Sequence, residues 1–313
     1  MEWKLDILGE GFSKCTVDQG TDYSGRVVCT VVRRMSDRSS SRGVLYIHGF
    51  SDYFFQKELA ECFAEHGYNF YAVDLRKYGR SLLAGQKMFQ VKDMSEYFPD
   101  IQAGIDIMKD EGNREVVILA HSTGGLSTSL YMQQRPGPDV KALMLNSPFL
   151  AWNLPKWLVK KGIPVLKLLA AWFPDFSFKT DNTTNYASAI AKHLGGEWTY
   201  KTEWKADTLP AVDLNWVRAI DKGQHALSKA TVNVPVLLMH SDKSAYKGDP
   251  QELFHRADAV LDVKSMAEAG RRLGPMVTEV TIKDGLHDLV LSRRDVRKQV
   301  YNTMFQWLDK NGL

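Results

Sequence analysis

Short apolar runs alternate with helix-like stretches along most of this chain, and this alternation limits its fold more than any other feature. Runs such as RGVLYIHGF, REVVILAH and VPVLLMHS are rich in β-branched and aliphatic residues and predict buried strands. Segments with helical periodicity, such as 96–109 and 126–134, lie between them, and Ser95 is the expected N-cap of the first. We therefore predict an α/β fold with a mainly parallel central sheet and crossover helices.

A long segment without such strands separates the run ending in LNSP from VPVLLMHS. It spans roughly eighty residues, far more than a simple crossover needs, and is rich in Trp, Lys and Leu. We predict an inserted helical cap at residues 152–230. The core of the fold is then divided into residues 1–151 and residues 231–313.

The balance of charges excludes some classes of partner. Lys and Arg number 40 against 37 Asp and Glu, and no long block of one sign occurs. This balance argues against nucleic acid or an anionic membrane as the main partner. The expected partner is a small-molecule ester, and the oligomeric state is left open.

Targeting and cofactor signals are also missing from the pattern. The start, MEWKLDILGEGF, carries charges where a secretory signal needs an apolar stretch, and lysines interrupt the most apolar segment, Trp157 to Phe173. The three cysteines lack metal-ligand spacing. We expect a cytoplasmic protein with no integral membrane segment, no metal and no cofactor.

The first chemical motif is VVILAHSTGGL, in which a β-branched run ends at Ser122 and a helical period follows two glycines. A sharp strand-turn-helix projects a serine hydroxyl from the sheet edge toward helix N–H groups, which suits a nucleophile. The usual pattern is Gly-x-Ser-x-Gly, and here Ala120 replaces the first glycine. Taken alone, the pattern favours a serine that caps a helix, so the assignment of Ser122 depends on other motifs.

Support comes from a strand that ends in His48-Gly49-Phe50, which resembles the oxyanion turn of serine hydrolases. In such a turn the backbone N–H groups of Phe50 and of Thr123 converge on the carbonyl oxygen that becomes negative. His48 is then expected to be structural and to hold the loop by hydrogen bonds.

A general base must follow the nucleophile, and the chain has eight histidines. His287 lies in TEVTIKDGLHDLVLS, where a strand ends and a turn precedes the last helix. A strand-end loop of this kind delivers an imidazole to the edge that bears Ser122. His121 neighbours the serine but is expected to point to the opposite side of the chain.

Five segments together resemble one known family: HGFSDYFFQ, VDLRKYGRSL, AHSTGGLS, LNSPF and GLHDL. They are similar, in order and over nearly the whole chain, to the lysophospholipase and monoacylglycerol-lipase-like branch of the α/β-hydrolases. The resemblance implies the α/β-hydrolase fold and a carboxylic ester substrate, often of a fatty or aromatic acid, without a cofactor. It also implies a structural role for Asp74 to Ser81.

A catalytic triad also needs an acid that orients the histidine, and this acid has two candidates. In the family the acid follows its strand within a few residues, but here Ser244 stands at that position, with Asp242 just past the strand. Asp258 comes later and directly precedes a segment of helical period. An insertion between strand and acid favours Asp258 as the partner of His287, and Asp242 is then expected to tie down the loop.

Aromatic residues supply the candidates for substrate binding. Tyr53 and Phe54 follow the oxyanion turn, and Trp157 and Trp172 lie in the predicted cap. Some of these side chains are expected to line an acyl pocket. The same residues would equally form the cap's own core, its seal against the sheet, or a subunit interface.

The function expected from these motifs is hydrolysis of carboxylic esters through an acyl-enzyme on Ser122. Two alternatives stay open. An aminopeptidase needs an acidic group in the cap for the substrate ammonium, and Glu197, Glu203 and Asp207 are available. A hydrolase-like ligand-binding protein with slow turnover is also compatible with a complete triad.

Overall fold

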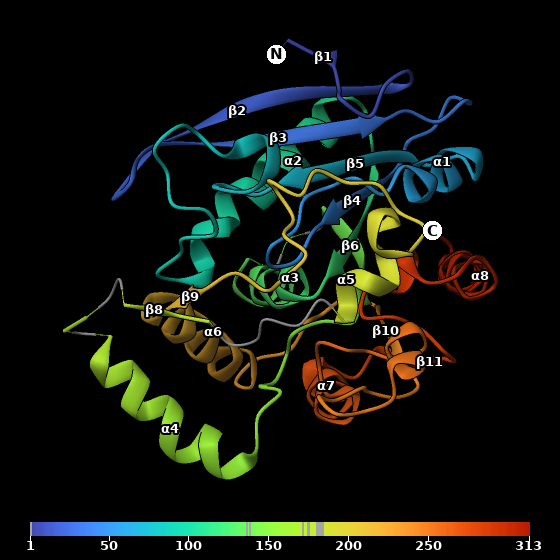
Figure 1. Ribbon diagram of the computed structural model, residues 1–313. Coiled ribbons are helices and arrows are strands. Elements are labelled where there is room, and N and C mark those ends of the chain that lie inside the picture. The colour runs from blue at the N-terminus through green and yellow to red at the C-terminus, as the bar shows by residue number, and fades with distance from the viewer. Residues whose placement is uncertain (1, 136, 138, 171, 174–175, 180–184) are drawn as a thin grey trace.

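The computed structural model describes residues 2–135, 137, 139–170, 172–173, 176–179 and 185–313, and a nine-stranded sheet forms its centre (Figure 1). The order is β1-β2-β3-β5-β4-β6-β7-β10-β11. From β5 through β11 all neighbours are parallel, whereas β1, β2 and β3 form an antiparallel edge. The predicted mainly parallel sheet is therefore confirmed. Its strands are β1 (Lys4–Leu5), β2 (Phe12–Asp22), β3 (Gly25–Arg34), β4 (Arg42–Ile47), β5 (Asn69–Asp74), β6 (Glu115–His121), β7 (Val140–Asn146), β10 (Val236–Ser241) and β11 (Val277–Ile282).

Helices cover both faces of this sheet and bury two separate apolar cores. Side chains alternate along each strand, so Leu45 and Ile47 of β4 enter one core and Val44 and Tyr46 the other. The first core includes side chains of α2 (Phe98–Asp110), α3 (Thr123–Gln134) and α7 (Val263–Gly270), and the second those of α1 (Lys57–Glu65) and α8 (Arg294–Lys310).

Two predicted helix starts are wrong. Ser95 is not the N-cap of α2, because a 3₁₀ turn at Met94–Tyr97 precedes the helix and Asp93 caps that turn by accepting the Ser95 N–H at 3.0 Å. The helix expected from residue 126 already begins at Thr123, since the chain turns at Ser122 without an intervening loop.

None of the described residues of the segment 152–230 belongs to a strand of the central sheet. It contains α4 (Lys156–Leu169), α5 (Asn185–Ile190) and α6 (Leu214–Leu227), and β8 (Ser177–Phe178) pairs with β9 (Val212–Asp213) in a small sheet of their own. Helix α4 packs on α6, which in turn packs on α3 (Figure 1). We refer to residues 152–230 as the insertion. Among the helices described, none has the length and apolarity that crossing a membrane would require.

The loop after β5 is fixed by buried charges. Asp74 accepts the N–H groups of Phe54 and Arg80, both at 2.9 Å, and the Arg80 guanidinium bridges Asp74 and Asp6. A Cβ at Gly79 would lie 2.5 Å from the Asp74 carboxylate, so glycine is required there. This loop therefore holds the chain segment that follows β4.

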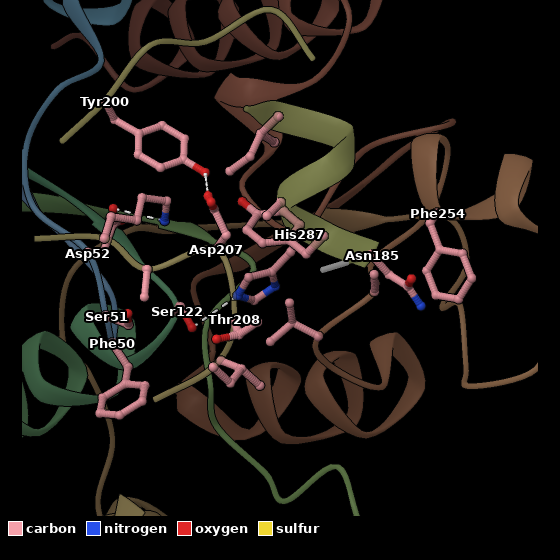
Figure 2. Close-up of a pocket in the computed structure, with 18 of the residues that line it drawn as sticks. Phe50, Ser51, Asp52, Ser122, Asn185, Tyr200, Asp207, Thr208, Phe254 and His287 are labelled. Atoms are coloured by element: carbon pink, nitrogen blue, oxygen red, sulfur yellow. Dashed lines mark hydrogen bonds and ion pairs between the residues drawn. The ribbon is translucent and has the colours of Figure 1, made fainter. Parts of the chain in front are cut away.

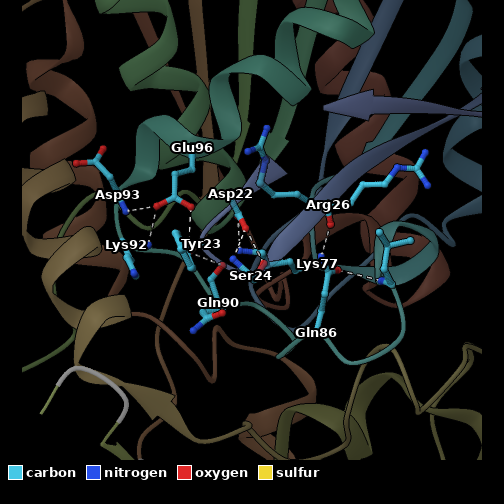
Figure 3. A network of polar contacts seen from close by, with 12 residues as sticks. Asp22, Tyr23, Ser24, Arg26, Lys77, Gln86, Gln90, Lys92, Asp93 and Glu96 are labelled. Carbon is cyan, nitrogen blue, oxygen red and sulfur yellow. Dashed lines mark hydrogen bonds and ion pairs between the residues drawn. The ribbon is translucent and has the colours of Figure 1, made fainter. Parts of the chain in front are cut away.

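Further contacts tie the same loop to the antiparallel edge (Figure 3). The buried Lys77 ammonium donates to Asp22 at 2.6 Å, and the Tyr23 hydroxyl donates to Glu96 at 3.0 Å. Asp22 is the last residue of β2, and Tyr23 lies in the turn between β2 and β3. The β2–β3 hairpin thus braces residues 77–96 from outside the parallel sheet.

Candidate active site

Ser122 occupies a strained turn between β6 and α3. Its backbone angles are φ 51° and ψ −119°, a region that favours glycine. The turn lies directly against the turn after β4: a Cβ at Gly124 would be 2.3 Å from the His48 carbonyl oxygen, and one at Gly49 would be 2.9 Å from the Ser122 Cβ. Only small residues allow this approach.

A chain of hydrogen bonds runs from Ser122 through His287 to Asp258. His287 Nε2 lies 3.1 Å from Ser122 Oγ, and His287 Nδ1 lies 2.9 Å from Asp258 Oδ2. The second carboxylate oxygen of Asp258 accepts the N–H groups of Val260 and Leu261 at 2.8 and 2.7 Å. These bonds hold the carboxylate in the orientation that reaches the imidazole.

The other candidate acid does not reach His287. Asp242 is exposed and accepts the Asp284 N–H at 2.8 Å, which ties two strand-end loops together. The chain leaves the sheet edge after Ser244 and returns to it at Asp258. Ser244 and Asp258 form an isolated parallel bridge there. Ser244 Oγ donates to the Leu261 carbonyl at 2.9 Å, so this serine supports the segment that carries Asp258.

Two backbone N–H groups are available beside Ser122. Phe50 and Thr123 line the same cavity as the serine, and within the described chain neither N–H donates to an acceptor. His48 fixes the first of these turns, because its Nε2 accepts the Leu75 N–H at 3.0 Å and its Nδ1 donates to the Gly49 carbonyl at 2.8 Å.

A cavity of about 490 Å³, lined mainly by apolar side chains, reaches Ser122. It is the larger of the two cavities described here. Helix α4 contributes Leu158, Ile163 and Leu166, and α6 contributes Trp216 and Val217. The rings of Phe149, Trp152 and Trp216 pack together in its wall, and the Phe50 ring lies 4.8 Å from that of Trp216. Phe149, Trp152 and Trp216 are not among the residues predicted from the sequence to line a pocket, although Phe149 follows the LNSP segment directly.

A smaller cavity of about 140 Å³ meets Ser122 and His287 on their polar side (Figure 2). Asp52 and Asp207 line it together with Lys205 and Lys247. The Lys205 ammonium donates to Asp52 Oδ1 at 3.0 Å, and the Tyr200 hydroxyl donates to Asp207 at 3.1 Å (Figure 2). Negative and positive groups are therefore balanced in this wall.

A buried group of potential metal ligands lies at the wall of the small cavity. Ligand atoms of Asp52, His121 and Asp288 all lie within 4.8 Å of one another. Burial lowers the pKa of His121, so its ring is neutral, and both carboxylate oxygens of Asp288 already accept side-chain amide protons. The Lys205 ammonium neutralises Asp52. The group thus carries its own cation, and the residues do not fit a divalent metal well.

Four predicted substrate-binding residues are placed elsewhere. Tyr53 is buried with its hydroxyl accepting the Lys201 N–H at 2.8 Å, and the Phe54 ring packs on Tyr46 in the second core. Trp157 and Trp172 are 67% and 76% exposed. None of the four lines either cavity that reaches Ser122, because α4 turns other side chains inward and the side chains of Tyr53 and Phe54 are buried in the interior.

Comparison with known proteins gives a consistent family assignment. The family model described as serine aminopeptidase, S33, matches residues 39–290. No curated protein sequence matches the chain significantly.

Solved structures resemble this one over almost their whole length. A soluble variant of monoglyceride lipase from Saccharomyces cerevisiae, in complex with a substrate analog, is 19% identical with a TM-score of 0.68 and covers 94% of each chain. Monoacylglycerol lipase of Paleococcus ferrophilus is 14% identical with a TM-score of 0.64, covering 95% of this chain and 99% of its own. A carboxyl esterase of Bacillus coagulans in complex with glycerol is 13% identical with a TM-score of 0.64, covering 96% and 99%. These likenesses establish the shared fold.

The backbone strain at Ser122 gives a first prediction. Ser122→Gly should raise the free energy of unfolding by about 1 kcal/mol relative to Ser122→Ala, because only glycine adopts φ 51° without cost. Both variants lose the same hydroxyl, so alanine is the matched control. Urea denaturation measures the difference, and an alanine variant as stable as the glycine variant would show that the turn is not strained.

Proposed function

The chain belongs to the serine aminopeptidase S33 family of α/β hydrolases, and from this premise we propose that it cleaves carboxylic esters through an acyl-enzyme on Ser122. The family match agrees with the resemblance to the lysophospholipase and monoacylglycerol-lipase-like branch. The observation that carries the proposal is the hydrogen-bonded series Ser122, His287 and Asp258 beside two unengaged backbone N–H groups.

In the first half of the reaction His287 Nε2 takes the proton of Ser122 as Oγ attacks the ester carbonyl carbon. The carbonyl oxygen becomes negative and is bound by the N–H groups of Phe50 and Thr123. Asp258 accepts from His287 Nδ1 and stabilises the imidazolium. The tetrahedral intermediate then collapses, the bond to the alcohol breaks, and the alcohol leaves with the proton from His287.

In the second half water replaces the alcohol. His287 Nε2 takes a proton from the water, and the resulting hydroxide attacks the acyl carbon. The same two N–H groups bind the second oxyanion. Collapse breaks the bond to Oγ, the carboxylic acid leaves, and the proton returns to Ser122.

The two cavities suit the two parts of an ester. The larger cavity, lined by aliphatic and aromatic side chains, would hold an apolar acyl group, and the smaller polar cavity the alcohol. Since Ile163 and Trp216 in the wall come from the insertion, we propose that residues 152–230 act as the predicted cap.

Electrostatics favours an ester over a peptide with a free N-terminus. Of the three acidic residues considered for an ammonium site, only Asp207 lines a cavity at Ser122, and His193 and Tyr200 already contact its carboxylate. Glu197 pairs with Arg297 instead. With Lys205 in the same wall, a substrate ammonium would find no unbalanced negative charge.

The catalytic proposal is tested by a fluorophosphonate probe. We expect the probe to modify Ser122 alone, because the neighbouring imidazole activates only this hydroxyl, and Ser122→Ala should lose both labelling and hydrolysis of a p-nitrophenyl ester. Mass spectrometry of the labelled peptide identifies the site. Labelling of another serine, or labelling without ester turnover, would contradict the proposal, and the second result would favour a ligand-binding protein.

The acid is tested by paired substitutions. Asp258→Asn should lower kcat by about 10⁴, because asparagine imposes the wrong tautomer on His287, whereas Asp242→Asn should change kcat by no more than about fivefold. Asp242 is the matched control, since it also follows β10 but contacts a backbone amide. The reverse order of losses in two folded variants would make Asp242 the acid.

The acyl pocket is tested by filling it. Leu158→Trp should lower kcat/KM for an octanoyl ester by about tenfold or more and leave the acetyl ester within about twofold, because the larger ring takes up cavity volume that only the longer acyl chain needs. Val165→Trp is the control on the outer side of the same helix, where it is 56% exposed. A chain-length profile that Leu158→Trp leaves unchanged would place the acyl group elsewhere.

A further inference from the structure

The loop that carries the N–H group of Phe50 has few hydrogen bonds of its own. The Gly49 carbonyl before it and the Phe54 N–H after it are both hydrogen-bonded, at 2.8 and 2.9 Å. Between them, in residues 50–53, no backbone N–H or carbonyl group forms a hydrogen bond of good geometry with another residue that the structure describes. Ser51 adopts φ 50° there, and such strain persists only where the surroundings hold the chain. We name residues 50–53 the oxyanion loop.

Two side chains of the oxyanion loop are hydrogen-bonded, and both partners belong to the insertion. Asp52 Oδ1 accepts from the Lys205 ammonium at 3.0 Å, and the Tyr53 hydroxyl accepts the Lys201 N–H at 2.8 Å (Figure 2 for the first). Both lysines belong to one turn, because the Lys205 N–H donates to the Lys201 carbonyl at 3.0 Å. Among the described residues, the turn 201–205 therefore supplies all the hydrogen bonds that anchor the oxyanion loop from outside.

The ion pair in this anchor is buried. The Asp52 and Lys205 side chains are 2% and 9% exposed, and the ammonium lies 5.8, 5.8 and 6.0 Å from the ring centres of Phe55, Tyr186 and Tyr200. A buried ion pair stabilises a fold little more than apolar side chains of the same volume, because both charges lose their hydration. It does fix the direction of the two groups, which an apolar contact does not.

We propose that Lys205 is a positioning residue for ester hydrolysis. Its ion pair with Asp52 holds the Phe50 N–H at the point where this group binds the oxyanion. Phe50 lies two residues before Asp52, so a shift of the carboxylate moves the short segment that carries the N–H. A misplacement of about 1 Å is enough to cost on the order of 100-fold in rate. This inference rests on the proposed function, and it makes the oxyanion site depend on the insertion.

A direct role of Lys205 in substrate binding must be distinguished from positioning, because Lys205 also lines the smaller cavity. A contact between the ammonium and the substrate alcohol would act on the bound ester as well as on the transition state, so its loss would raise KM. Loss of an oxyanion donor acts on the transition state alone and lowers kcat. The ratio of the two effects separates the two roles.

The test is the kinetics of Lys205→Met with p-nitrophenyl acetate. We expect kcat to fall by about 30-fold or more and KM to stay within about threefold, because only the binding of the oxyanion is weakened. The inhibition constant of a trifluoromethyl ketone, which forms a tetrahedral oxyanion on Ser122, should rise by a similar factor. Lys167→Met is the matched control, since it removes an ion pair with Asp221 at 2.6 Å inside the insertion.

A second variant covers the case in which Lys205→Met does not fold. Lys205→Met leaves Asp52 as a buried charge without its partner, whereas Lys205→Met combined with Asp52→Asn removes both charges. The double variant should fold and still lose kcat to a similar extent, because the ion pair is absent. Thermal unfolding followed by circular dichroism verifies the fold of each variant. In a crystal structure of the folded variant, the Phe50 nitrogen should have moved relative to Thr123 by about 1 Å or more.

Four results would overturn the proposal. Two are a folded variant with unchanged kcat and a loss of equal size in Lys167→Met, which would indicate a general effect of the insertion. The third is a raised KM with kcat retained, which would assign Lys205 to the substrate alcohol. The fourth is an unmoved Phe50 nitrogen. A wild-type protein without ester turnover would contradict the proposed function, whereas the crystal structure of the variant decides independently whether Lys205 positions the Phe50 N–H.

Discussion

The close contact between the turns that follow β4, β6 and β7 is the constraint on which the site depends. A Cβ at Gly124 would overlap the carbonyl oxygens of Ile47 and His48, at 2.6 and 2.3 Å, and one at Gly125 would lie 2.6 Å from the Pro148 side chain. Because these contacts leave no room for side chains, the start of α3 sits directly against the end of β4. The N–H groups of Phe50 and Thr123 are thereby brought to one point beside Ser122.

Much of this arrangement was predictable because it is local. Strand ends and turns are encoded in short stretches, so the positions of Ser122, Phe50 and His287 at one sheet edge followed from where each apolar run stops. Asp258 was harder, since thirteen residues separate it from Ser244 in the chain. The bridge between Ser244 and Asp258 accounts for this separation, because residues 245–257 leave the sheet edge and return to the same place.

The direction of individual side chains was not predictable, because it depends on tertiary contacts. Ser51 adopts φ 50°, and this single turn sends Tyr53 and Phe54 below the site instead of into it. Both faces of α4 are apolar, so hydrophobicity alone did not distinguish Trp157, which faces outward, from Leu158, which lines the cavity. The prediction of Ser95 as an N-cap was wrong for a related reason. Asp93, two residues earlier, accepts the Ser95 N–H and starts the turn.

The contacts between the insertion and the loop after β4 indicate that the insertion does more than cover the cavities. Lys205 binds Asp52, the Lys201 N–H donates to Tyr53, and the Trp204 ring lies 5.1 Å from the Tyr53 ring. Asp52 and Tyr53 follow Phe50, the proposed oxyanion donor, within three residues. A displacement of residues 201–205 would therefore be transmitted to the Phe50 N–H through an ion pair and a hydrogen bond that are both largely buried. Helix α4 lines the larger cavity with Leu158, Ile163 and Leu166, so one part of the insertion supports the loop that carries Phe50 and another part bounds the space beside Ser122.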